Sequence, residues 1–96
     1  SGYTASGYYI GDGRIYYQDP TFGSVRIVAA DAKYPLGTIL RLGYQNSTIT
    51  AIVLDRGGGI GDGKKFQIDL LTTNNSKAYE LGIVQNTHLE VLRLGY

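Results

Sequence analysis

Short strand-like runs separated by turn signals dominate this chain of 96 residues. The turn signals include Pro35 with Gly37, the pair Gln45-Asn46, and a glycine-rich stretch over 57–63. Many short runs at this spacing favour a small β-barrel or β-sandwich. We therefore predict an all-β fold, with strands at 24–31, 38–44, 47–55, 66–71 and 87–94 and weaker candidates at 1–9 and 13–17.

One segment departs from the strand pattern. Residues 74–82, NNSKAYELG, begin with an asparagine that can cap a helix and end at Gly82, a typical stop signal. We expect one short helix there. No repeat, linker or low-complexity tract divides the chain, so residues 1–96 are expected to form one domain. Because the chain starts at Ser1 without a signal peptide, we expect a domain excised from a longer secreted protein.

Composition excludes several classes of function. Nine basic residues are nearly balanced by eight acidic ones, so the chain lacks the positive charge typical of a nucleic-acid partner. It has no stretch of about 18 apolar residues, so we expect no membrane insertion. The absence of cysteine excludes disulfide and thiolate chemistry, and a single histidine, His88, excludes a Ser-His-Asp triad. We expect neither a metal nor a cofactor.

Tyrosine is unusually frequent, with nine copies in the chain. The pairs Tyr8-Tyr9 and Tyr16-Tyr17 lie close together in the N-terminal quarter. Tyrosine favours strands, and its amphipathic ring can also stack against a ligand. Both interpretations stay open, and Tyr8 and Tyr9 are the candidates for lining a binding site.

Three aspartates lie at or near the ends of predicted strands. Burying an unpaired carboxylate is costly, so an acid in such a run indicates a specific role. Period-two alternation places Asp31 on the face of Ala29 and Asp55 on the face of Val53, while Asp69 points away from the apolar face of its run. We predict that the three acids meet in one cleft at one end of a small barrel.

Three motifs, taken in order, resemble the three-aspartate (3D) domain of bacterial stationary-phase survival proteins and cell-wall enzymes. They are VAADAKYPLGT (28–38), AIVLDRGGGI (51–60) and QIDLL (67–71), and the resemblance also reaches YTASG near the N-terminus. The chain is also similar to the catalytic barrel of membrane-bound lytic transglycosylase A and, more loosely, to rare lipoprotein A. Arg56 replaces the threonine usual in the 3D motif, and the following loop is longer.

The resemblance implies a small six-stranded double-psi β-barrel with one short helix and a site that cleaves peptidoglycan. The implied enzyme is a lytic transglycosylase, which breaks the β-1,4 bond between N-acetylmuramic acid and N-acetylglucosamine and forms a 1,6-anhydro product. Asp69 aligns with the general acid/base, and Asp55 and Asp31 support it. The implied partner is the glycan strand of peptidoglycan, and the protein would be secreted or associated with the cell wall. The expected substrate-binding residues are Gly57, Gly58, Gly59, Arg56, Thr38, Tyr8 and Tyr9.

Structural alternatives exist for the same residues. Asp31 can accept backbone N–H bonds in the turn at 35–38, and Arg56 can form a structural ion pair with Asp55. Two other functions also fit the pattern. A non-catalytic wall-binding or wall-loosening module of the expansin type would bind glycans without anhydro products. Half of an aspartic protease, indicated by Asp-x-Gly, would need a dimer to pair two acids.

Overall fold

The computed structural model describes residues 3–9, 15–44, 47–56, 68–71, 79–80 and 89–96. Within these ranges the chain is mainly β, and no helix long and apolar enough to cross a bilayer occurs in them. The strands are β1 (Tyr16–Asp19), β2 (Gly23–Ala30), β3 (Ile39–Tyr44), β4 (Ser47–Asp55), β5 (Ile68–Leu71), β6 (Tyr79–Glu80) and β7 (Leu89–Arg93). The all-β prediction is confirmed at this level.

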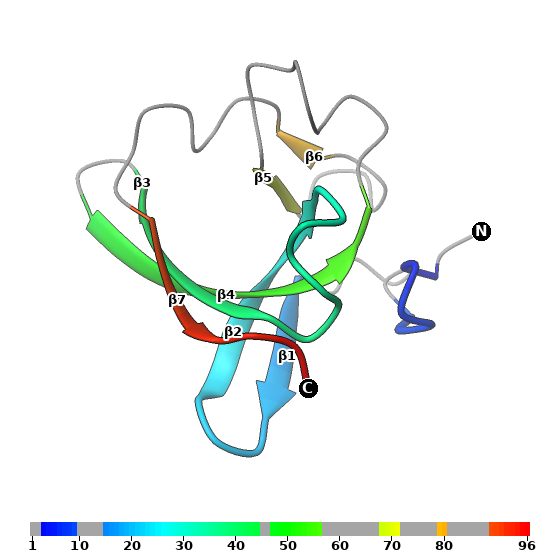
Figure 1. Cartoon of the computed structure of the whole chain (residues 1–96), viewed down its shortest axis with the longest axis horizontal. Coiled ribbons are helices and arrows are strands. Elements are labelled where there is room, and N and C mark those ends of the chain that lie inside the picture. The colour runs from blue at the N-terminus through cyan, green and yellow to red at the C-terminus, as the bar shows by residue number, and fades with distance from the viewer. Residues whose placement is uncertain (1–2, 10–14, 45–46, 57–67, 72–78, 81–88) are drawn as a thin grey trace.

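The strands form one sheet in the order β6-β5-β2-β4-β3-β7, with β1 also paired to β2. Strand β2 is the centre: it pairs with β4 in parallel, and with β1 and β5 antiparallel along successive parts of its length. Figure 1 shows a strongly curved sheet, with β4 bowed beneath β5 and β6 in that view. The described strands leave this sheet open. The expected closure into a barrel and the count of six strands are therefore not confirmed.

The helix predicted for 74–82 is wrong where the structure describes that segment. Tyr79 and Glu80 form β6 and pair with Leu71 and Leu70 of β5. The other residues of the predicted helix lie outside the described ranges. At these two positions pairing with a neighbouring strand, for which tyrosine is well suited, outweighs a local helix signal.

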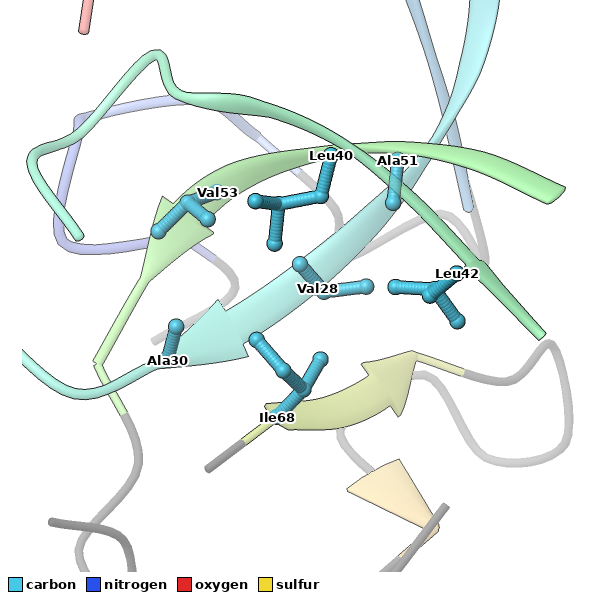
Figure 2. Close-up of a cluster of buried hydrophobic side chains, with 7 residues drawn as sticks. All are labelled: Val28, Ala30, Leu40, Leu42, Ala51, Val53 and Ile68. Atoms are coloured by element: carbon cyan, nitrogen blue, oxygen red, sulfur yellow. The ribbon is translucent and has the colours of Figure 1, made fainter. Parts of the chain in front are cut away.

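The central part of the sheet is buried on both faces, and each face carries its own apolar cluster. Figure 2 shows the first cluster, in which side chains from β2, β3, β4 and β5 point toward one another inside the curve of the sheet. Its members are Val28, Ala30, Leu40, Leu42, Ala51, Val53 and Ile68. The second cluster lies on the opposite side and contains Val25, Ile27, Ile39, Ile52 and Leu54. Burial on both faces explains why the runs of β2 and β4 are almost continuously apolar.

An ion pair joins the turn between β1 and β2 to the C-terminal strand. The Arg93 guanidinium donates to both carboxylate oxygens of Asp19, at 2.9 and 3.1 Å. The Asp19 side chain is 1% exposed, and its Oδ2 also accepts the backbone N–H groups of Thr21 and Phe22. Arg93 further donates to the carbonyl of Gly37 at 2.9 Å. A bidentate pair with every carboxylate oxygen engaged is the strong form of such an interaction.

A tight turn over 35–38 ends the connection from β2 to β3. Thr38 N–H donates to the carbonyl of Pro35, and Gly37 N–H donates to the carbonyl of Val53 at 2.7 Å. Gly37 adopts a φ of 92°, a left-handed conformation that favours glycine. The ring of Tyr96 lies against Gly37, in the space that a β-carbon would occupy.

Gly37→Ala is therefore expected to destabilise the protein by about 2 kcal/mol or more, since the left-handed conformation and the steric conflict both oppose it. The new β-carbon would lie 2.7 Å from the backbone nitrogen of Tyr96. Gly23→Ala is the matched control, because Gly23 also has a positive φ but nothing lies within 4 Å of the position that a β-carbon would take there. It should cost only about 1 kcal/mol. Urea denaturation of both variants tests this, and equal losses would contradict the role of Tyr96.

Candidate functional site

The register of the sheet brings the backbones of the three predicted acids to one end of β2. Ala29 pairs on one side with Asp55 of β4 and on the other with Asp69 of β5. Asp31 lies two residues beyond Ala29, directly after β2 ends. Since neighbouring strands are spaced by about 4.8 Å, the Cα atoms of Asp55 and Asp69 lie about 10 Å apart across Ala29. For Asp69 the structure describes this backbone position.

An irregularity in the pairing of β2 with β4 sets the position of Asp55 opposite Ala29. The register shifts between Val28 and Ala29, so that Val28 pairs with Val53 whereas Ala29 pairs with Asp55. Leu54 is the extra residue of a β-bulge, a device that redirects side chains at strand ends. Simple alternation places Asp55 on the face of Val53. The bulge breaks that alternation, so the side chain cannot be assigned to a face from sequence spacing.

The Asp55 carboxylate holds the N-terminal segment against the end of β4. Its Oδ1 accepts the backbone N–H of Ala5 at 2.8 Å and that of Arg56 at 2.9 Å. Beside this contact, Ser6 N–H donates to the carbonyl of Leu54 at 3.0 Å. Residues fifty positions apart in sequence therefore meet at Asp55.

The N-terminal loop, residues 3–9, is a compact element that contacts Asp55 through Ala5. Its centre is Thr4, which is buried, and whose hydroxyl accepts the N–H of Tyr8 at 3.1 Å. Gly7 N–H donates to the Thr4 carbonyl, and Tyr3 and Tyr9 form an isolated antiparallel bridge. The weak strand expected over 1–9 is thus a turn-containing loop in its described part, because the Thr4 hydrogen bonds and the positive φ of Gly7 reverse the chain.

Asp31 begins the turn that follows β2. Its Oδ1 accepts the N–H of Ala32 at 2.7 Å, and its carbonyl accepts the N–H of Tyr34 at 3.0 Å. The side chain is half-buried. The described hydrogen bond of its carboxylate is to the N–H of Ala32. The alternative role expected from the sequence, accepting N–H groups of the turn at 35–38, is not among its described hydrogen bonds.

Arg56 reaches from the end of β4 to the end of β2. Its Nη1 donates to the carbonyl of Ala30 at 3.3 Å, next to Asp31. The side chain is half-buried, so the positive charge stays within the acidic end of the sheet and remains partly accessible. A guanidinium in this position can balance the negative charge of the aspartates and can donate to a polar ligand.

The remaining predicted substrate residues fall into different environments. Tyr8 packs against the second apolar cluster, with its ring edge-on to Tyr17 at 5.1 Å. Tyr9 is exposed. Thr38 is fully buried and its hydroxyl accepts the N–H of Gly95 at 2.9 Å, so it is a structural residue with no surface to offer a ligand. The glycines expected to approach the substrate, Gly57, Gly58 and Gly59, lie outside the described residues.

Tyr3 is a surface residue of this region that the sequence patterns did not single out. Its ring is 66% exposed and lies 5.1 Å from the ring of Tyr9, centroid to centroid. The signal was present, since Tyr3 opens the YTASG motif that forms part of the family resemblance.

The described strands define a mainly β domain in which the backbone positions of Asp31, Asp55 and Asp69 lie at one end of β2, and these three residues are called the acidic cluster below. Comparison of the chain with protein families, with curated proteins and with solved structures finds no match. A proposal about what this cluster does is therefore supported by its own residues and by the resemblance of the sequence motifs.

Proposed function

We propose that this chain is a peptidoglycan lytic transglycosylase domain, completed as a double-psi β-barrel and working outside the cell or in its wall. One observation carries the proposal: the register that puts Asp55 and Asp69 on either side of Ala29, with Asp31 just beyond. Three carboxyls at one end of a sheet suit glycosidic cleavage, which requires a carboxylic acid beside the scissile bond. The motif resemblance supplies the transglycosylase reaction.

In the proposed mechanism Asp69 is the general acid and then the general base. Protonated Asp69 donates its proton to the bridging oxygen as the bond from C1 of N-acetylmuramic acid to that oxygen breaks. The 6-hydroxyl of the same sugar attacks C1, and its proton passes to Asp69, which is thereby restored. No water is consumed, and neither a metal nor a cofactor takes part.

The contacts of Asp55 support this division of roles. Asp55 Oδ1 accepts two backbone N–H bonds, which fix the position of this side chain at the end of β4. Asp55 is therefore assigned the supporting role of a side chain held in place beside the site. Nearby carboxylates favour the protonated form of a further carboxyl, because like charges repel. Asp55 and Asp31 would keep Asp69 protonated until it meets the substrate.

Release of muropeptides from purified peptidoglycan tests the function directly. The protein is incubated with insoluble peptidoglycan, and the soluble products are identified by mass spectrometry. We expect 1,6-anhydro products, each lighter by one water than the corresponding hydrolytic product. Products with a reducing end would identify a hydrolase instead. Sedimentation of the protein with peptidoglycan, without release, would identify the non-catalytic wall-binding module.

A further inference from the structure

The N-terminal loop contains three tyrosines, of which one packs against the core and two are exposed to solvent. Tyr8 packs against the second apolar cluster, whereas Tyr3 and Tyr9 lie outside, 66% and 43% exposed. The two outer rings contact each other at an interplanar angle of 58°. Exposed aromatic rings in mutual contact form an apolar patch, which is a typical feature of a binding surface.

The backbone holds this ring pair in a defined arrangement. Tyr3 and Tyr9 form a bridge at the base of the loop, and Thr4 N–H donates to the Tyr8 carbonyl at 2.8 Å between them. The Thr4 hydroxyl also contacts that of Ser6 at 2.8 Å. A surface ordered before binding loses less conformational entropy when a ligand arrives.

The backbone that carries Tyr3 lies close to Asp55. Ala5, whose N–H donates to Asp55, is two residues from Tyr3, so their Cα atoms are at most about 7 Å apart. Other exposed aromatic rings have different surroundings: Tyr16 lies against the guanidinium of Arg26 at 5.6 Å, and Phe22 against that of Arg93 at 5.8 Å.

We propose that Tyr3 and Tyr9 form a stacking platform that binds a pyranose ring of the glycan strand beside the acidic cluster. This inference rests on the proposed function, because it names where that substrate is held. The flat apolar face of a pyranose matches an aromatic ring, and the tyrosine hydroxyl can bond to the sugar's polar edge. An extended glycan lying on this platform would pass the end of the sheet where Asp55 is anchored.

Binding of a β-1,4-linked N-acetylglucosamine tetramer tests the platform. Calorimetry is performed in the Asp69→Asn background, so that turnover does not interfere. Tyr3→Ala and Tyr9→Ala should each weaken binding on the order of tenfold, as expected for aromatic residues at the centre of a contact. Tyr3→Phe and Tyr9→Phe keep the ring and should stay within about threefold of the parent. Tyr16→Ala removes an exposed tyrosine elsewhere and should leave the affinity unchanged.

The possible outcomes distinguish a failure of the proposed platform from a failure of the proposed transglycosylase reaction. Contacts between sugar C–H groups and the two rings in nuclear Overhauser spectra of the phenylalanine variants would support the platform even if an alanine variant failed to fold. Unchanged affinity in both folded alanine variants would overturn the platform, while anhydro products from the wild type would still support the transglycosylase. Ring-dependent binding without anhydro products would keep the platform and overturn the reaction. Absence of tetramer binding by the Asp69→Asn parent, or ring-dependent binding of a wall stem peptide alone, would overturn the platform.

Discussion

Asp69→Asn is expected to lower the release of anhydro muropeptides on the order of a hundredfold, because the amide cannot donate and recover the catalytic proton. Asparagine has nearly the same size, so the pairing of β5 with β2 through Ala29 should persist. Product release measured by mass spectrometry at matched protein concentrations gives the effect. The circular dichroism spectrum of the variant should match that of the wild type.

Asp55→Asn provides the comparison. Its side-chain oxygen can still accept the N–H groups of Ala5 and Arg56, so the N-terminal loop should stay docked. Loss of the negative charge should reduce activity less than Asp69→Asn does, and the alkaline fall of the pH–rate profile should move to lower pH. Near-full activity of Asp69→Asn together with loss of activity in Asp55→Asn would show that Asp55 is the acid.

Asp19→Ala should have the largest effect on stability, a loss of about 3 kcal/mol in the free energy of unfolding. The substitution leaves the Arg93 guanidinium without its bidentate partner and removes the acceptor of the Thr21 and Phe22 N–H groups. Glu90→Ala is the control, because Glu90 and Arg41 are 3.7 Å apart and half exposed. Its loss should stay below about 1 kcal/mol. Urea denaturation at neutral pH compares them, and losses of equal size would contradict the special role of Asp19.

The ion pair between Asp19 and Arg93 also predicts that the stability of the fold depends on pH. The hydrogen bond from Arg93 is the main cause that lowers the pKa of Asp19 from its ordinary value of 3.8, with the N–H groups of Thr21 and Phe22 adding to it. Because the pKa is lowered in the folded state, the stabilisation is fully present above the unfolded pKa and is lost as pH falls through the folded one. The stability difference between the wild type and Asp19→Ala should therefore shrink as pH falls below about 4.

Local pattern predicted most of the strands because their side chains alternate or are buried on both faces. Strand β4 occupies the predicted residues 47–55, and β2, β3, β5 and β7 lie within one to two residues of their predicted runs. These strands depend on residues close together in the sequence, where hydrophobic period is informative. The positions of the three acids at or near strand ends suggested that they lie at one end of the sheet, but the pairing of β2 with β4 and β5 is what aligns their backbones.

The rest depends on contacts between distant residues. Asp19 and Arg93 are 74 positions apart, and no local signal marks either one as the other's partner. The bulge at Leu54 and the pairing of Tyr79 with β5 are likewise set by the neighbouring strand. Tyr8 and Tyr9 are adjacent in sequence, yet Tyr8 packs against the second apolar cluster and Tyr9 is exposed, in a loop whose backbone is held by Thr4.

The central position of β2 has a consequence for the order in which the candidate site can be assembled. The antiparallel pair β3–β4 is local and can form early, but the parallel pairing of β2 with β4 needs a long connection to close. Asp55 and Asp69 become neighbours only when β2 has entered between their strands. A chain in which only the β3–β4 hairpin has formed therefore does not yet hold Asp55 and Asp69 on either side of Ala29, so the arrangement on which the proposed activity depends requires β2 to be in place.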